Sequence, residues 1–211
     1  MDAVPETLTF FLFSTLGLLA FGCAFQGLLL ARDDLDGGWF GQSVVLLFEH
    51  KDTEGTMGII LNRPTRATLG QLVKNTPLEL SSKLSSCLDL PVSLGGPVDT
   101  ASLLVVSNKE VAGAQRIVDG LYVLGIVEAA DNMQRGLIER DDVHLYMGYS
   151  GWAPWQLTEE IKQGGWWCGA ADVSTVLARP RLPASSAMVG VTEALGNDAA
   201  MWADLKTRIG L

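Results

Sequence analysis

The sequence contains few of the side chains that build metal sites and disulfide frameworks. Its 211 residues include three cysteines, Cys23, Cys87 and Cys168, and two histidines. The cysteines are odd in number and far apart, so neither a disulfide framework nor a C-x-x-C zinc or redox pair can be written. We therefore expect no metal ion and no cofactor.

Positive charge is also scarce. Fifteen lysines and arginines stand against 24 aspartates and glutamates, a net charge of −9, and the cations form no cluster or arm. Such a chain repels phosphate backbones, so nucleic acid is not an expected partner. With 48% hydrophobic residues and a mean hydropathy of +0.25, the chain is more apolar than a typical soluble domain. We expect part of it to contact lipid.

Charge is absent altogether from residues 7–25. As a helix this segment would span about 28 Å, against about 30 Å for the hydrocarbon core of a bilayer. Its apolar residues lie on all sides, which argues against an amphipathic surface helix. We predict a single-pass transmembrane anchor helix within residues 1–26 and one domain in residues 27–211.

Two other interpretations of this segment remain open. The small residues Gly22, Cys23 and Ala24 suit the cleavage site of a signal or import peptide, although Asp2 and Glu6 stand where such peptides carry basic residues. A helix buried in the core of the domain would also be apolar on all sides. If the segment is a cleaved targeting peptide, the mature chain would be a soluble regulatory protein.

The rest of the chain alternates short apolar runs with amphipathic segments in an irregular order. This pattern predicts an α+β fold with mainly antiparallel or mixed β-sheets flanked by helices. The expected strands are residues 27–32, 43–49, 56–61, 102–107, 121–125 and 143–147, and the expected helices are residues 69–74, 127–138, 155–163 and 199–209. A serine-rich stretch, residues 81–86, is expected to form a surface loop.

The catalytic motifs of the sequence are incomplete. The stretch Gly148-Tyr149-Ser150-Gly151-Trp152 comes close to the G-x-S-x-G nucleophile elbow, but Trp152 occupies the place of the last glycine. The two histidines, His50 and His144, both lie on or beside predicted strands. The sequence leaves enzymatic activity open, favours a non-enzymatic protein and assigns no catalytic residue.

Tryptophan is concentrated in one stretch of sixteen residues, which holds Trp152, Trp155, Trp166 and Trp167. Indole rings in such number either pack in a core or form a contact surface, because exposed aromatic rings are costly without a partner. We take Trp155, Trp166 and Trp167 as candidate protein-interface residues.

Five blocks of sequence occur in an order and spacing typical of one family. The blocks are Gly27-Leu28-Leu29-Leu30-Ala31, Ser43 to His50, Gly55 to Pro64, Gly95-Gly96-Pro97-Val98, and Gly148 to Trp152 with Gln156-Leu157 and Glu160-Ile161. Together they resemble the AlgH/YqgE family over residues 27–178, and residues 202–210 resemble its closing helix. The resemblance implies a compact α+β domain of unestablished molecular function and carries over no catalytic residue.

Three residues depart from the pattern of that family. Phe48 stands where bacterial members often have cysteine, which argues against a thiol-based redox role there. Trp155 and Thr158 replace the usual glycine and glutamate. A bulky aromatic residue in place of glycine at a helix start suggests a new contact, and the apolar N-terminal segment is a further addition.

These observations support a leading hypothesis and an alternative. The first is a non-enzymatic accessory, scaffold or regulatory subunit of a membrane-bound assembly in a plastid (thylakoid) or mitochondrial membrane, with other subunits and, through residues 7–25, the bilayer as partners. The alternative is a small-molecule-binding protein or enzyme, in which Asn62-Arg63-Pro64 meets Gly95-Gly96-Pro97 and Arg63 holds an anionic group. The candidate ligand-binding residues are Asn62, Arg63, Gly95, Gly96, Tyr149 and Trp152.

Overall fold

The computed structural model describes residues 27–33, 35, 38–74, 82–178 and 198–208. The predicted N-terminal helix in residues 7–25 lies outside these ranges. Among the helices inside them, none is both long enough and apolar enough to cross a membrane. The described residues cover most of the segment that we predicted to form the domain.

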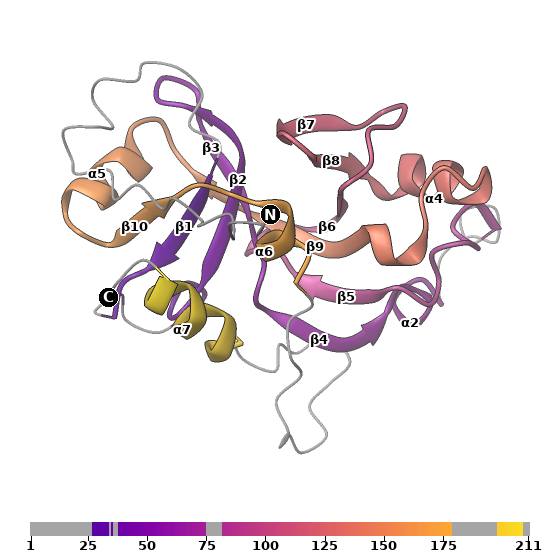
Figure 1. The fold of residues 1–211 in the computed structure, drawn as a ribbon, viewed down its shortest axis with the longest axis horizontal. Helices are drawn as coiled ribbons and strands as arrows, with labels where there is room; N and C mark the ends of the chain where they lie inside the picture. Colours follow the sequence, from indigo (N-terminus) through magenta and orange to yellow (C-terminus); the bar gives the residue numbers. More distant parts are fainter. Residues whose placement is uncertain (1–26, 34, 36–37, 75–81, 179–197, 209–211) are drawn as a thin grey trace, which may run out of the picture.

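A ten-stranded sheet forms the centre of the described structure (Figure 1). Neighbouring strands follow the order β10-β1-β2-β3-β9-β6-β8-β7, with β4 paired to β5 and β5 to β9. These pairs are antiparallel except β5 with β9, so the predicted α+β fold with a mainly antiparallel sheet is confirmed. The strands are β1 (Leu28–Ala31), β2 (Val44–Lys51), β3 (Gly55–Ile60), β4 (Pro64–Thr68), β5 (Pro91–Leu94), β6 (Val98–Ser107), β7 (Gln115–Val118), β8 (Leu121–Gly125), β9 (Val143–Trp152) and β10 (Trp166–Gly169).

The sheet curls so strongly that strands far apart in its order meet. The Gln115 side chain on β7 donates a hydrogen bond to the Phe48 carbonyl on β2 at 3.4 Å. Residues of β1, β2 and β3 share one hydrophobic cluster with residues of β6, β7, β8 and β9. This cluster fills the concave face of the sheet and forms the main core.

Two further clusters cover the outer faces, and a set of short helices packs over all three. In the second cluster, α2 and α4 lie over β5, β6, β8 and β9, while in the third α5 lies over β1, β2 and β3. The helices are α2 (Leu69–Leu72), α4 (Ile126–Gln134), the 3₁₀ turn η1 (Arg140–Asp142), α5 (Gln156–Lys162), α6 (Val173–Val176) and α7 (Ala199–Arg208). Because both faces of the sheet are covered, strands such as β1 are continuously apolar rather than alternating.

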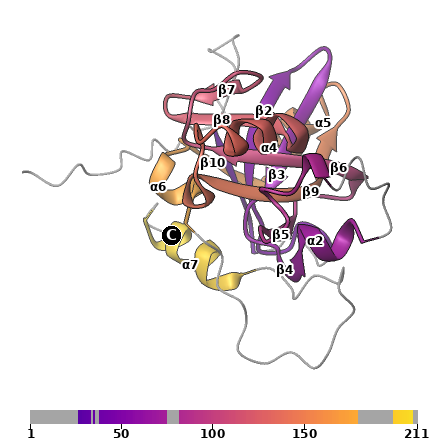
Figure 2. The same ribbon diagram turned by 90° about the vertical axis from the view of Figure 1, so that its right-hand side faces the viewer.

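Helix α7 closes the concave face beside α6, and the two helices lie next to each other in both views (Figure 1, Figure 2). Trp202 and Leu205 of α7 are buried in the main core. The Trp202 indole donates a hydrogen bond to the Ala31 carbonyl at 2.8 Å, and Lys206 lies 2.5 Å from the Asp33 carboxylate. The predicted C-terminal helix is confirmed, and it joins the last described residues to the first strand.

Strand β9 connects the two halves of the sheet. Its first half pairs with β5 and β6, and its last residues, Ser150 to Trp152, pair with β3. The stretch that resembled an incomplete nucleophile elbow is therefore continuous strand rather than a strand-to-helix turn. The Ser150 hydroxyl is fully buried and donates to the Gly95 carbonyl at 3.2 Å, which removes it from contact with any substrate.

Candidate functional site

Asn62 lies just after the end of β3, and its side chain is completely buried. Its amide nitrogen donates to the carbonyls of Gln42, at 2.9 Å, and Asp198, at 3.1 Å. Its oxygen accepts a hydrogen bond from the Val44 N–H at 2.9 Å. These bonds use both N–H donors of the amide, so Asn62 links the residue 38–43 loop, β2 and the start of α7.

Arg63 follows directly and is partly exposed. Its carbonyl accepts a hydrogen bond from the Leu94 N–H at 2.8 Å, so the Asn62-Arg63-Pro64 turn does meet the segment leading to Gly95. Its Nη1 donates to the Trp39 carbonyl at 2.8 Å, and its guanidinium carbon lies 4.3 Å from the centre of the Trp39 ring. Burial lowers the pKa of the Arg63 guanidinium, which means that the site favours the charged form less than water does.

Gly95 and Gly96 pack backbone to backbone against residues 148–150. A Cβ atom on Gly95 would lie 2.3 Å from the Gly148 carbonyl oxygen, and one on Gly96 would lie 2.3 Å from the Tyr149 carbonyl group. Gly148 has φ +70°, and its Cβ would lie 2.6 Å from the Gly96 oxygen. No side chain fits between these backbones, so packing alone is sufficient reason for the three glycines. We name this contact the glycine junction.

The six residues predicted to bind a ligand fall into separate environments. Asn62 and Arg63 face the residue 38–43 loop, and Gly95 and Gly96 form the glycine junction. Tyr149 packs against the main core on the concave face, whereas Trp152 lies in the third cluster on the outer face. Side chains three positions apart in a strand point to opposite faces, so Tyr149 and Trp152 do not line the same cleft.

An aromatic cluster fills the space between α5 and the outer face of the sheet. The Trp152 and Trp166 rings meet edge to face, with centres 6.0 Å apart, and Phe40 contacts both. Both indole N–H groups donate to one oxygen of Glu160, each at 2.9 Å. Gln156 donates to the other oxygen at 2.9 Å. Trp166, one of our interface candidates, is only 4% exposed and belongs to this core.

The other two interface candidates are accessible to different degrees. Trp167 is half-buried between two cations, with Arg32 5.1 Å and Lys206 5.5 Å from its ring centre. Trp155 is 54% exposed, and its backbone is left-handed, with φ +65°. A bulky residue rarely adopts this conformation, because its Cβ crowds the carbonyl oxygen.

The backbone around Trp155 is held firmly. Its N–H donates to the Asp52 carbonyl at 2.9 Å, and its carbonyl accepts from the Glu159 N–H at 3.0 Å as α5 begins. The Thr158 hydroxyl donates to the Asp52 carboxylate at 2.7 Å. The turn between β2 and β3 is thereby fastened to the start of α5. The Trp155 ring is thus an exposed group on a rigid support, which we name the Trp155 corner.

His50 takes part in an arrangement that superficially resembles a catalytic triad. Its Nδ1 lies 2.7 Å from the Thr56 hydroxyl, and its Nε2 lies 3.7 Å from an Asp52 carboxylate oxygen. Thr56, however, is only 4% exposed within the β2–β3 pair. A nucleophile must reach its substrate, so these contacts are better explained as reinforcement of the hairpin.

The hollows and thiols of the described residues do not form a reaction centre. A small apolar hollow of about 10 Å³ lies beneath Leu205, and a larger open one of about 240 Å³ lies beside Glu160. Burial raises the pKa of the Cys168 thiol to about 12 and also raises that of Cys87. Both thiols are therefore poor nucleophiles at neutral pH. Within the described ranges no three metal-ligating side chains come together.

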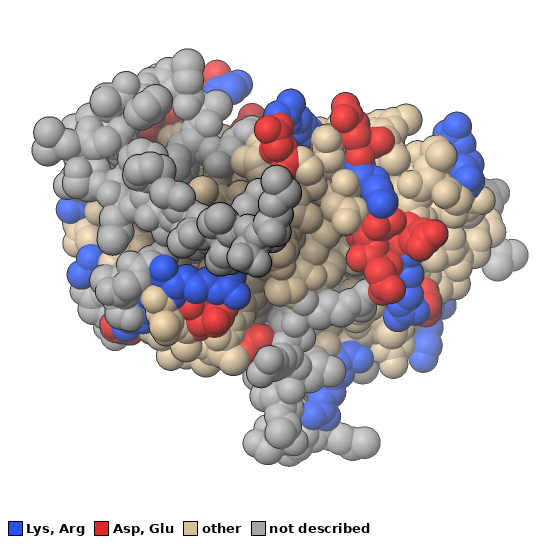
Figure 3. All heavy atoms as spheres, in the orientation of Figure 1, with Lys and Arg blue, Asp and Glu red and all other residues tan. Residues whose placement is uncertain are grey.

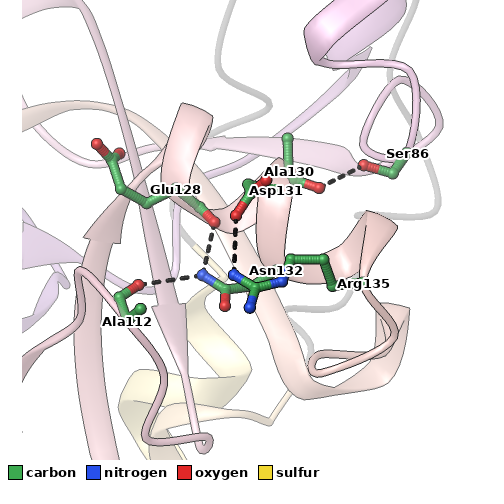
Figure 4. Close-up of polar contacts among 7 residues, drawn as sticks. All are labelled: Ser86, Ala112, Glu128, Ala130, Asp131, Asn132 and Arg135. Carbon is green, nitrogen blue, oxygen red and sulfur yellow. Dashed lines mark hydrogen bonds and ion pairs between the residues drawn. The ribbon is translucent and has the colours of Figure 1, made fainter.

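A second polar cluster anchors α4 and was not predicted (Figure 4). The buried Asn132 amide donates to the carbonyls of Ala112, at 3.1 Å, and Glu128, at 2.8 Å. Nearby, the Ser86 hydroxyl donates to the Ala130 carbonyl at 3.0 Å. These bonds tie two loops to the helix and hold the second cluster together, which is a structural role.

Charged residues on the face seen in Figure 3 are mixed in sign, with acidic and basic side chains lying next to each other. Among the described residues, ion pairs at short range include Lys109 with Asp142 at 3.3 Å and Arg135 with Asp131 at 3.3 Å. This arrangement is typical of a solvated surface and differs from the continuous basic stripe of a nucleic-acid-binding protein.

Comparison with known proteins shows several relatives of this chain. A family profile described as AlgH-like matches residues 28–197. A UPF0301 protein of Ruegeria pomeroyi is 32% identical over 156 residues, which are 71% of this chain and 80% of that protein. A UPF0301 protein of Bacteroides fragilis is 33% identical over 141 residues, which are 66% of this chain and 67% of that protein.

Two solved structures share the fold. The solution structure of the AlgH protein from Pseudomonas aeruginosa has a TM-score of 0.62 and 19% identity, with 100% of this chain and 93% of that chain covered. The crystal structure of protein DIP2367 from Corynebacterium diphtheriae has a TM-score of 0.62 and 22% identity, with 88% and 87% covered. At these identities the likeness concerns the fold alone.

Proposed function

The chain belongs to the AlgH-like family, and on this premise we propose that it is a non-enzymatic accessory, scaffold or regulatory subunit of a membrane-bound assembly. In this proposal residues 7–25 tether the domain to a plastid or mitochondrial membrane by a single helix. The Trp155 corner binds another protein subunit of the assembly.

The observation that carries the proposal is the state of Trp155. Its left-handed backbone costs about 1 to 2 kcal/mol relative to an ordinary conformation. Its ring, 54% exposed, also leaves apolar surface in water. Aromatic residues on rigid supports are the usual anchors of protein interfaces, and a partner that covers the ring would offset both costs. Such a partner is the simplest reason to keep tryptophan at this position.

The chemistry of the remaining residues supports a non-enzymatic role. Ser150 and Thr56 are buried hydroxyls, the two described thiols have raised pKa values, and the Glu160 carboxylate accepts three hydrogen bonds. Each of these groups has a structural partner or lacks access to solvent. The tether is supported by the sequence of residues 7–25, which lacks charge and is long enough to span a bilayer.

The interface part of the proposal is tested by replacing Trp155 in the full-length protein. We expect Trp155→Gly and Trp155→Ala to weaken association with the assembly by about 2 kcal/mol, roughly thirtyfold in Kd, as for other aromatic anchors. The measurement is co-migration with the native complex, extracted from membranes of the source organism in mild detergent. Leu137→Ala, at a residue 49% exposed after α4, is the matched control and should leave association unchanged. Unchanged co-migration of both Trp155 variants would remove this surface from the proposal.

The tether is tested separately by alkaline carbonate extraction. The full-length protein should stay in the membrane pellet, and a variant lacking residues 2–26 should be released. If the full-length protein is released and its mature N-terminus begins after residue 22, the chain is instead a soluble regulatory protein with a cleaved targeting peptide.

A further inference from the structure

Arg63 differs from four other arginines of the described structure, which form ion pairs. Arg116, Arg135, Arg140 and Arg208 each pair with an aspartate at the surface. Among the residues that the structure describes, no acidic side chain forms an ion pair with the Arg63 guanidinium, whereas each of these four arginines has one. A cation partly withdrawn from water usually has an anionic partner, because desolvation of an isolated charge is unfavourable.

The guanidinium of Arg63 has unused hydrogen-bonding capacity. Of its five N–H donors, the described contacts use one, from Nη1 to the Trp39 carbonyl at 2.8 Å. The Nε atom is buried without a hydrogen-bond partner, and none of the described hydrogen bonds uses Nη2. The free edge of the guanidinium therefore consists of Nε and Nη2, whose parallel N–H groups match two oxygens of a carboxylate or phosphate.

The surroundings hold this edge in place. The Trp39 ring covers one face of the guanidinium, with its centre 4.3 Å from Cζ. The same loop is fastened by the buried Asn62 amide, which bonds to Gln42 and Val44. The Arg63 backbone is bonded to β5 through Leu94. A side chain ordered before binding loses less entropy when a ligand arrives.

We propose that Arg63 binds the carboxylate or phosphate group of a small ligand through its Nε/Nη2 edge, with Trp39 covering the guanidinium face. This site is more restricted than the cleft expected from the sequence, because Gly95 and Gly96 are occupied by the glycine junction. Because Nε is buried, the atoms that cover it must move when an anion binds. The environment of Trp39 should therefore change on binding. The proposal does not depend on the Trp155 corner.

The test follows the Arg63 side chain directly by NMR. The full-length chain, labelled with ¹⁵N-arginine and held in detergent micelles, is titrated with sodium phosphate and, in a separate arm, with sodium acetate. Ionic strength is kept constant with sodium chloride. The Nε–H resonance of Arg63 is assigned by its absence from Arg63→Lys. We expect a saturable shift of this resonance in at least one arm, and the responding arm identifies the ligand group as phosphate or carboxylate.

Two controls make the result decisive. The Nε–H resonance of Arg208, which is exposed and paired with Asp204, should show no saturable shift. Arg63→Lys keeps the positive charge but loses the two parallel N–H donors of the Nε/Nη2 edge. In this variant the change in tryptophan fluorescence that accompanies anion binding should require roughly tenfold more anion. A linear shift, an equal shift at Arg208 or no shift in either arm would overturn the proposal, and these outcomes are read on the unmodified protein. Trp155→Gly should leave the titration unchanged, which separates this site from the proposed scaffold role.

Discussion

Gly148 and Trp155 have almost the same φ angle, +70° and +65°, and lie only seven residues apart. At the glycine junction a Cβ atom on residue 148 would lie 2.6 Å from the Gly96 carbonyl oxygen. At the Trp155 corner the side chain projects from the surface and remains 54% exposed. At residue 148 this φ angle therefore requires glycine, because any Cβ atom would clash. At residue 155 the same angle is only unfavourable, because the tryptophan side chain has room.

The difference shows that two separate quantities decide whether a residue tolerates a left-handed backbone. One is the torsional cost, about 1 to 2 kcal/mol for any residue with a Cβ. The other is the space around the Cβ, which varies from site to site. Where a Cβ atom would clash, packing explains why the residue is glycine. Where a Cβ atom fits, packing does not explain a large side chain in a left-handed backbone, and a functional reason is needed.

The largest expected effect on stability comes from adding a Cβ atom at the glycine junction. Gly148→Ala should lower the free energy of unfolding by about 3 kcal/mol or more, because a backbone-to-backbone clash adds to the torsional cost. Gly136 provides the control, since it has φ +70° with no heavy atom within 4 Å of an added Cβ. Gly136→Ala should cost only about 1 kcal/mol. Urea denaturation of both variants measures the difference, and equal losses would contradict the role given to space.

Between the junction and the corner lies Trp152, whose indole shares the Glu160 carboxylate with Trp166. Glu160→Ala should lower the free energy of unfolding by about 2 to 3 kcal/mol, because two buried N–H groups lose their acceptor. Glu160→Gln keeps one acceptor oxygen and should lose about 1 kcal/mol. Both values come from thermal or urea denaturation. If the glutamine variant is no more stable than the alanine variant, the carboxylate oxygen is not the acceptor that matters.

A smaller effect separates the torsional cost of the backbone at residue 155 from the packing of the Trp155 side chain. Trp155→Gly should be more stable than Trp155→Ala by about 1 kcal/mol, because only glycine escapes the left-handed penalty. The two variants differ by a single methyl group, so their comparison cancels the packing lost with the indole. Denaturation curves under identical conditions measure the difference. An alanine variant as stable as the glycine variant would show that the backbone at residue 155 is unstrained.

The smallest effect concerns the support of the corner. Thr158→Val removes the hydroxyl that donates to Asp52 at 2.7 Å and keeps the shape of the side chain. We expect a loss of about 0.5 to 1 kcal/mol, since the carboxylate can turn to water. The turn between β2 and β3 should also exchange its amide hydrogens faster. Hydrogen exchange that is unchanged at Asp52 to Gly55 would mean that Thr158 does not hold the turn.

Much of the fold was predictable, because its central strands are buried on both faces. Residues 44–48, for example, are continuously apolar, and the structure places β2 there. Four strands were missed: β4, β5, β7 and β10. β4 begins at Pro64, and β5, β7 and β10 have only four residues each, with Gln115 and Arg116 opening β7. Strand β9 was predicted only to residue 147, because its glycines resemble a turn in sequence. They are needed where β9 passes close to Gly95 and Gly96.

The candidate site was harder to predict, because its residues are defined by what surrounds them. Sequence could suggest that Asn62-Arg63-Pro64 meets Gly95, and the two segments do meet through Leu94. It could not show that Tyr149 and Trp152 face opposite sides, since the predicted strand ended at residue 147, before both of them. It also gave no sign that Trp39 covers Arg63. The two residues are 24 positions apart, Trp39 in the residue 38–43 loop and Arg63 directly before β4.

Strand β1 has a consequence for the order in which the chain can fold as it leaves the ribosome. On one side it pairs with β2, which follows it closely, and on the other with β10, from Leu28 opposite Gly169 to Ala31 opposite Trp166. Its second partner is thus synthesised more than a hundred residues later, and α7 follows β10. Until then an unpaired edge of apolar backbone is exposed at the very start of the domain. Nascent chains stalled before residue 166 should therefore be prone to strand-mediated aggregation, and α7 would cover the core only after β10 has been synthesised.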